Sequence, residues 1–459
     1  MRNSSENYQP VSKHRVNGTD MYQQHRRRLI ELFQDNPDHL LYLKGGSVAN
    51  RYQTDYEYPF RQESNFLYLT GIDEPDMAAI LHCGSGDFTL VIPRHTAQFA
   101  VWMGYIRTPE EYRNRYEPDH VIYDDEVSDW LKKNHPKKIH CLPGIESHIE
   151  SLGYPAETGH LQDALAYCRV IKSEGEIDHL KKAATVANEA HIEVMKAVKP
   201  GAFEYEMKAL FEYQTVRNGL VHAPYSGIFA SGTGSAILHY TDNQKQMHDG
   251  ELFLVDAGSE YRGYAADITR TYPVGKTFSP LQADLYDIVL DAQNITLNMI
   301  RPGNKMEDLH LTAAQRIVSG LRDCGLVSGS TEELMDANIF ALFFPHGLGH
   351  FLGLDTHDVG GYPKGTEVID RPGLRFLRAR RTFEPGMVLT IEPGLYIIPA
   401  LLEPAFNDDS KAAMLNTERI SELFGFGGIR IEDNVIVREN GMENLTTVPK
   451  TRREIEHLR

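Results

Sequence analysis

Apolar and polar positions divide the chain into two regions with different patterns. Before residue 170, short apolar runs alternate with turn signals and with a helical stretch at Met21–Phe33. This alternation predicts a small α/β domain. The runs expected to form its strands are His39–Leu43, Ala78–Leu81, Phe88–Ile92 and Lys138–Leu142.

A long amphipathic helix is expected at the start of the second region. From Ile177 to Val198 apolar residues recur at helical spacing, and Pro200-Gly201 then ends the pattern. The pattern changes just before this helix, around Arg169–Glu176, from short apolar runs to apolar residues at helical spacing. We therefore expect a domain boundary near residue 173, with one domain over residues 1–172 and a second over residues 173–459.

The second region contains strand-like segments that are bounded by glycine or proline. Helical patterns at Leu281–Ile300 and Leu309–Leu321 separate the first pair of these segments from the second pair. This order predicts an α+β domain with a largely antiparallel sheet. The expected strands are Glu251–Ala257, Tyr264–Tyr272, Met387–Glu392 and Gly428–Val437.

Composition narrows the possible partners. The 459 residues include 64 acidic and 47 basic side chains, for a formal net charge of −17. Such a charge repels phosphate backbones and anionic lipid, so we expect neither a nucleic acid nor a membrane as partner. No apolar run approaches the ~20 residues that cross a bilayer. The polar N-terminus lacks the apolar segment of a secretory signal, and the four cysteines form no CxxC pair, which predicts reduced thiols and a cytoplasmic protein.

Two aspartates are the first candidates for a metal site. Asp256 ends an apolar strand, and Asp267 follows eleven residues later with Gly258 and Gly263 between them. Two strands joined by a turn would bring these carboxylates together. Close carboxylates cannot both stay ionised without a counter-charge, which a divalent cation would supply.

Further residues of ligand type follow downstream. His350 lies in FPHGLGH, while Glu392 and Glu432 occupy apolar, β-rich sequence in which an ordinary strand buries a hydrophobic residue. Each position alone also fits a turn residue or a structural histidine, but four carboxylates and one imidazole together balance two divalent ions. The oxygen-rich set favours Mn(II), with Co(II), Fe(II) and Zn(II) as alternatives.

In these contexts the order Asp, Asp, His, Glu, Glu resembles the pita-bread metallopeptidases, which include methionine aminopeptidase, aminopeptidase P and prolidase. The resemblance covers essentially all of residues 170–459, and YPFRQESNFLYLTGIDEPD also resembles the first domain of the proline-directed members. It implies a pita-bread catalytic domain over residues 173–459, an aminopeptidase P-like domain over residues 1–172, and a homodimer. The segments that carry it are LFLVDAG, YAADITRTYPV, FPHGLGHFLGLDTHDVGGYP, EPGMVLTIEPGLY and GFGGIRIEDNVIV.

The resemblance also implies a role for each site residue. Asp256 would bind one ion, Asp267 and Glu432 would bridge both ions, and His350 with Glu392 would complete a site. The implied reaction is hydrolysis of the bond between an N-terminal residue and proline, with Glu392 as general base. His357 would contact the tetrahedral intermediate and His239 the residue after the cut. The remaining pocket residues implied by the resemblance are His346 and Arg430.

One segment bears on the length of the substrate. IDRPGLRFLRARR resembles an arginine-rich segment of prolidases, in which an arginine that matches Arg378 binds the free carboxylate of a dipeptide. A solvated basic turn is the other interpretation of this segment. We expect an Xaa-Pro dipeptidase, with an Xaa-Pro aminopeptidase as the alternative. A metal-free binding module of the same fold is a third possibility, although such a protein would lack one or more of the five ligands kept here.

Overall fold

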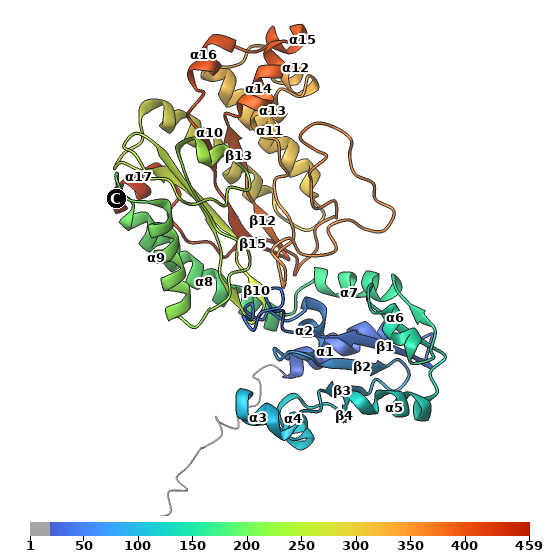
Figure 1. Ribbon diagram of the computed structural model, residues 1–459. Coiled ribbons are helices and arrows are strands. Elements are labelled where there is room, and N and C mark those ends of the chain that lie inside the picture. Colours follow the sequence, from blue (N-terminus) through green and yellow to red (C-terminus); the bar gives the residue numbers. More distant parts are fainter. Residues whose placement is uncertain (1–18) are drawn as a thin grey trace, which may run out of the picture. The chain divides into compact units, whose positions relative to one another are not determined.

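The computed structural model describes residues 19–459, and the chain folds into two compact units. The first unit ends at Cys168 and the second runs from Arg169 to Arg459. Figure 1 shows their helices and strands in the order of the sequence. Within the described part of the chain, none of the helices combines the length and the apolar character needed to cross a membrane.

The first unit is built around a six-stranded mixed sheet with the order β4-β3-β2-β1-β5-β6. Its strands are β1 (His39–Lys44), β2 (Ala78–His82), β3 (Phe88–Ile92), β4 (His120–Tyr123), β5 (Lys138–Cys141) and β6 (Ala156–Glu157). The four strands predicted from apolar runs are therefore confirmed to within one residue at each end. Its helices are α1 (Thr19–Glu31), α2 (Ser64–Thr70), α3 (Ala97–Met103), α4 (Pro109–Tyr116), α5 (Val127–Asn134), α6 (Glu146–Ser151) and α7 (His160–Val170).

Long helices support the second unit. Helix α8 (Glu174–Ala197) begins with a capping box between Ser173 and Glu176 and ends before Pro200, as the sequence pattern predicts. It packs against α9 (Glu204–Arg217), while α10 (Pro280–Met299) packs against α11 (Met306–Asp323). The shorter helices are α12 (Thr331–Asp336), α13 (Phe340–Phe343), α14 (Pro399–Phe406), α15 (Asp409–Ala412), α16 (Thr417–Glu422) and α17 (Arg452–Leu458).

All the strand pairs described in the second unit are antiparallel, as predicted. The sheets have the orders β11-β8-β7, β12-β15-β16, β13-β14 and β10-β9, and a bridge between Thr269 and Glu432 joins the first sheet to the C-terminal strands. In Figure 1, β12 and β15 lie between the pair α8–α9 and α11. The strands are β7 (Ile228–Ser231), β8 (Leu252–Ala257), β9 (Glu260–Tyr261), β10 (Tyr264–Ala265), β11 (Ile268–Pro273), β12 (Val388–Ile391), β13 (Gly394–Tyr396), β14 (Gly428–Arg430), β15 (Asp433–Arg438) and β16 (Gly441–Asn444).

Two predicted strands are not continuous, and both breaks occur at candidate metal ligands. The segment predicted as Tyr264–Tyr272 is interrupted at Asp267, whose backbone N–H donates to the side-chain oxygen of Asn434 at 3.0 Å. The segment predicted as Gly428–Val437 is interrupted at Glu432. A regular strand alternates its side chains between two faces, and a local break changes where a side chain points. The breaks thus coincide with the two carboxylates that the resemblance treats as bridging.

A glycine allows the close backbone approach beside the first break. A Cβ added at Gly258 would lie 1.8 Å from the carbonyl oxygen of Ala266, a distance that no side chain tolerates. The chain passes here from β8 into the β9–β10 hairpin and returns as β11, so that Asp256 lies opposite Thr269. Gly258 therefore helps to bring Asp256 and Asp267 together.

Candidate active site

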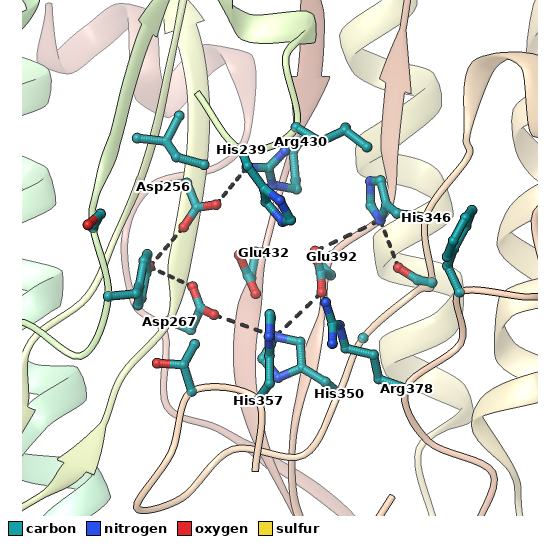
Figure 2. A pocket seen from close by; sticks show the side chains of 18 of the residues that line it. His239, Asp256, Asp267, His346, His350, His357, Arg378, Glu392, Arg430 and Glu432 are labelled. Carbon is teal, nitrogen blue, oxygen red and sulfur yellow. Dashed lines mark hydrogen bonds and ion pairs between the residues drawn. The ribbon is translucent and has the colours of Figure 1, made fainter. Parts of the chain in front are cut away.

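A cavity of ≈ 670 Å³ in the second unit is lined by all ten residues singled out from the sequence. Figure 2 shows their side chains converging on one space from strands and loops that are far apart in the sequence. A cavity of this size suits a small ligand held by a few polar groups. The ten residues are His239, Asp256, Asp267, His346, His350, His357, Arg378, Glu392, Arg430 and Glu432.

Asp256 and Asp267 lie side by side, as predicted, and share a tyrosine. The hydroxyl of Tyr225 is 2.8 Å from Oδ1 of Asp256 and 2.6 Å from Oδ1 of Asp267. Burial raises the pKa of Asp256, and the nearby Arg430 opposes this shift. Burial acts in the same direction on Asp267, but hydrogen bonding and the charge of His350 hold its pKa below the ordinary value. The pair therefore lies in a desolvated site that favours a cationic partner.

His350 presents one ring nitrogen to the carboxylates. Its Nδ1 lies 2.9 Å from the carbonyl oxygen of Phe351, which can only accept, so Nδ1 carries the hydrogen in the neutral ring. The lone pair of Nε2 then faces Oδ2 of Asp267 at 3.5 Å and Oε1 of Glu392 at 3.6 Å. A backbone carbonyl that fixes the tautomer of a histidine is a usual feature of metal-binding imidazoles.

Two glutamates lie beside these groups, Glu432 buried and Glu392 mostly so. Burial raises the pKa of Glu392 to about 7. Glu432 is 2% exposed, and its Oε2 accepts a hydrogen bond from Thr269 at 2.7 Å. Its Oε1 has no hydrogen-bond partner among the residues that the structure describes. A buried carboxylate oxygen without a partner is costly, and a cation would satisfy it.

The positions of these donor atoms fit a metal ion. One donor atom from each of Asp267, His350 and Glu432 lies within 4.8 Å of the other two. Asp256 and Glu392 line the same cavity. Four carboxylates and one imidazole form an oxygen-rich set that suits divalent ions such as Mn(II). The residues present therefore fit the metal centre expected from the sequence.

Arg430 and His346 belong to a hydrogen-bonded chain beside the carboxylates. Arg430 donates through Nη2 to Oδ2 of Asp256 at 2.6 Å and through Nη1 to the hydroxyl of Tyr396 at 2.9 Å. The Tyr396 hydroxyl lies 2.8 Å from Nε2 of His346, whose Nδ1 bonds the carbonyl oxygen of Gly347. Burial lowers the pKa of His346 to about 3, so this ring is neutral and accepts from Tyr396. His346 thus supports the site through Tyr396 and Arg430.

Three exposed side chains line the entrance side of the cavity. Figure 2 shows His239 on one side of the carboxylates and His357 with Arg378 on the other. Within residues 19–459 the guanidinium of Arg378 makes no hydrogen bond or ion pair, so it is free to bind an anion. Burial and the charge of His350 lower the pKa of His357 to about 4, with a smaller contribution from Arg378. His357 is therefore a neutral imidazole near neutral pH.

A buried ion cluster holds the loop that carries His357. Oδ1 of Asp358 lies 2.6 Å from Arg169, and its Oδ2 lies 2.8 Å from Nζ of Lys172. The side chains of all three residues are at most 2% exposed. Because Asp358 is adjacent to His357 in the sequence, the cluster restrains the position of this histidine.

The sequence interpretation missed the hydroxyl groups around the site. Tyr225, Thr269 and Tyr396 contact the carboxylates, Arg430 or His346. Thr390 accepts a hydrogen bond from the backbone N–H of His350 at 3.1 Å. Hydroxyl residues are common throughout the chain, so nothing in the spacing distinguishes these four. The one exception is Thr269, which lies two residues after Asp267 in the sequence and could have been suspected for that reason.

Comparison with known proteins gives a consistent result. The profile of Metallopeptidase family M24 matches residues 178–439, and that of the Aminopeptidase P, N-terminal domain matches residues 22–140. The chain is 40% identical to human Xaa-Pro dipeptidase over 450 residues, which cover 94% of this chain and 91% of the relative. It is 37% identical to a probable Xaa-Pro aminopeptidase, pepP, of Botryotinia fuckeliana, with 95% and 96% of the two chains covered.

Solved structures agree over nearly the whole length. The aminopeptidase PepP of Pseudomonas aeruginosa is 32% identical with a TM-score of 0.83, covering 97% of this chain and 98% of its own. Zn substituted Escherichia coli aminopeptidase P in complex with product is 31% identical with a TM-score of 0.83, and 98% of each chain is covered. The resemblance and the fold class expected from the sequence are confirmed. The chain belongs to metallopeptidase family M24, with an aminopeptidase P-type N-terminal domain before a pita-bread catalytic domain.

Proposed function

We propose that this metallopeptidase hydrolyses the bond between an N-terminal residue and proline, and that its preferred substrates are Xaa-Pro dipeptides. The observation that carries the proposal concerns Arg378, whose guanidinium has no hydrogen-bond or ion-pair partner among residues 19–459. This side chain lines the same cavity as the five candidate metal ligands. The human relative at 40% identity is named Xaa-Pro dipeptidase. The same cavity would thus hold the metal ions that cleave the peptide bond and the arginine that binds the free carboxylate of a dipeptide.

The metal centre would hold two divalent ions, preferably Mn(II). Asp256, Asp267, His350, Glu392 and Glu432 would hold the ions. The contacts of Asp267 with Tyr225 and His350, and that of His350 with Glu392, support this assignment because they bring the donor groups together. When bound, the ions would lower the pKa of a water molecule and polarise the scissile carbonyl.

The protein side chains would transfer a proton and donate hydrogen bonds during hydrolysis. Glu392 would take the proton of the attacking water and deliver it to the prolyl nitrogen, which cannot leave as an anion. The neutral ring of His357 would donate a hydrogen bond to the oxygen that gains charge, and His239 would contact the proline residue.

Arg378 would select the length of the substrate. In an Xaa-Pro dipeptide the carboxylate follows the proline ring directly, whereas in a longer peptide the same place is taken by a neutral amide. A guanidinium gains two charge-assisted hydrogen bonds from the carboxylate and much less from the amide. The position of Arg378 on the same side of the cavity as His357 supports this role.

An Xaa-Pro aminopeptidase is the second candidate. It is favoured by the solved aminopeptidases P, which match this chain over almost its full length. Turnover of an Xaa-Pro dipeptide against that of an Xaa-Pro-Xaa tripeptide tests the proposal. Preference for the dipeptide supports it, and preference for the tripeptide assigns the aminopeptidase activity. Absence of metal-dependent cleavage of either peptide would leave the metal-free binding module.

Three further proposals concern the setting of the enzyme. We infer a homodimer and a cytoplasmic location. We also propose a domain boundary between residues 172 and 173, close to the division between the compact units at Cys168 and Arg169. In the described chain no disulfide joins any of the four cysteines, which fits a reducing compartment. The homodimer is inferred from the family resemblance, and light scattering after size exclusion tests it.

A further inference from the structure

A second group of ligand-type side chains lies in the first unit, at one edge of its sheet. Ile139 of β5 enters the hydrophobic core, so the next residue, His140, points to the opposite face. Strands β5 and β6 pair in parallel with His140 beside Glu157. Helix α7 begins three residues later with His160. The fold thus places two imidazoles and one carboxylate on the same edge.

The donor atoms of these three residues converge. One donor atom from each of His140, Glu157 and His160 lies within 4.8 Å of the other two. Nδ1 of His140 contacts Oε2 of Glu157. The two imidazole rings stand nearly perpendicular, at 80°, with their centroids 5.7 Å apart, and Phe33 packs against both. His140 is 4% exposed whereas His160 is exposed, so the group is anchored at one end and open to solvent at the other.

A fourth residue fixes the orientation of the central ring. Nε2 of His140 lies 2.9 Å from Nδ1 of His39. If Nδ1 of His140 binds a cation, Nε2 carries the hydrogen and donates it to His39. Outer partners of this kind hold metal-binding histidines in one tautomer.

A hydrogen bond from His140 to Glu157 accounts for two of the three side chains. It leaves unexplained why His160 brings a third donor atom to the same point.

We propose that His140, Glu157 and His160 bind a divalent ion of the zinc class, with His39 as a positioning residue. Two imidazole nitrogens and one carboxylate are the ligands of zinc sites that keep one position open for water. None of the four residues lines the peptidase cavity. The nitrogen-rich set also differs from the oxygen-rich set of that cavity, so the two sites would prefer different ions. A bound ion would join β6 to β5 and to the start of α7.

Zinc content of the full-length protein tests the proposal. The metal-stripped wild type and its variants are equilibrated with micromolar zinc alone, and the zinc bound per chain is measured by mass spectrometry of the eluted metal. His160→Ala and Glu157→Gln should each bind one zinc ion fewer than the wild type. His39→Ala should bind zinc about 10- to 100-fold more weakly at this site. The matched control is His120→Ala, which removes an exposed histidine of β4 outside the group.

Hydrogen exchange locates the ion independently of the peptidase centre. Zinc should protect the backbone amides around Glu157 and His160 in the wild type and in His120→Ala, but not in His160→Ala. Turnover with Mn(II) should be unchanged in His160→Ala, because this residue lies outside the peptidase cavity. Equal zinc content in all variants, or binding at this edge only at millimolar zinc, would overturn the proposal.

Discussion

The Nε2 atom of His350 lies 3.5 Å from Oδ2 of Asp267, while the Nδ1 atom of the same ring is engaged by a backbone carbonyl. In its neutral form the histidine presents a lone pair to a carboxylate, an arrangement that a cation between the two groups would stabilise. Three further carboxylates line the same cavity, and the buried one, Glu432, has an oxygen with no partner in the described chain. The donor groups of the site are thus arranged to bind a metal ion, and the predictions below depend on that ion.

Removal of the Asp267 carboxylate should weaken both metal binding and catalysis. Asp267→Ala is expected to lower kcat/KM by at least about a hundredfold, roughly 3 kcal/mol, because the proposed metal centre loses a ligand. Metal content measured after gel filtration should fall as well. Asp291→Ala is the control, since this aspartate is about half exposed in α10 and pairs with Arg316. An Asp267→Ala enzyme that keeps both its metal and its activity would contradict the dinuclear centre.

Arg378 should affect dipeptides far more than tripeptides. Arg378→Ala is expected to reduce kcat/KM for Gly-Pro by about a hundredfold, since a charged hydrogen bond to the substrate carboxylate is worth roughly 1.5–3 kcal/mol. The loss on Gly-Pro-Gly should be small. Arg375→Ala serves as a control, because this arginine is exposed and pairs with Asp370. Equal losses on the two substrates would remove Arg378 from the carboxylate-binding role.

The stability of the metal-free enzyme should depend on pH through Glu392. Burial raises the pKa of this carboxyl from 4.5 to about 7, so the folded metal-free state holds a proton that the unfolded chain has already released. Its stabilising contribution is complete below pH 4.5 and is lost as pH rises through 7. Chelation should therefore lower the Tm more at about pH 8 than at about pH 5.5, and metal affinity should weaken as pH falls below about 7.

A variant that cannot titrate provides the check. Glu392→Gln keeps the shape of the side chain but removes its charge, so the effect of chelation on Tm should depend less on pH. Calorimetry with and without chelator at the two pH values measures both quantities. The same pH dependence in wild type and Glu392→Gln would show that another group is responsible.

The ion cluster behind His357 should contribute to stability. Lys172→Met leaves the buried carboxylate of Asp358 with one cationic partner fewer, and loss of a buried partner costs about 3–5 kcal/mol. Urea unfolding followed by fluorescence should show this decrease. Lys208→Met is the matched control, because its pair with Glu212 is exposed and 3.8 Å long, and it should change stability by less than about 0.5 kcal/mol. Similar effects of the two substitutions would contradict the structural role of the cluster.

Much of the fold could be predicted from periodicity. Four of the six strands of the first unit, and helix α8, follow from apolar spacing and from breakers such as Pro200-Gly201, whereas the short strands β4 and β6 were not predicted. The breaks at Asp267 and Glu432 could not be predicted in this way, because apolar neighbours on both sides continue the strand pattern through each of them. The breaks depend on tertiary contacts such as the bond from Asp267 to Asn434.

The sequence also predicted most of the candidate site. All ten residues expected in the site line one cavity, because residue type, order and context restrict them strongly. Tyr225 was missed, since a hydroxyl that bonds two aspartates is defined only by the folding of a distant loop. Tyr396 was missed for the same reason, as its partners Arg430 and His346 come from separate segments.

The central claim is an Xaa-Pro dipeptidase that depends on metal ions, and one comparison tests it most directly. Initial rates on Gly-Pro and on Gly-Pro-Gly are measured with the same enzyme, first stripped of metal and then supplied with Mn(II). We predict no turnover without metal, and after addition of Mn(II) a kcat/KM for Gly-Pro at least about tenfold above that for the tripeptide. A higher kcat/KM for Gly-Pro-Gly, or full activity in the stripped enzyme, would contradict the account.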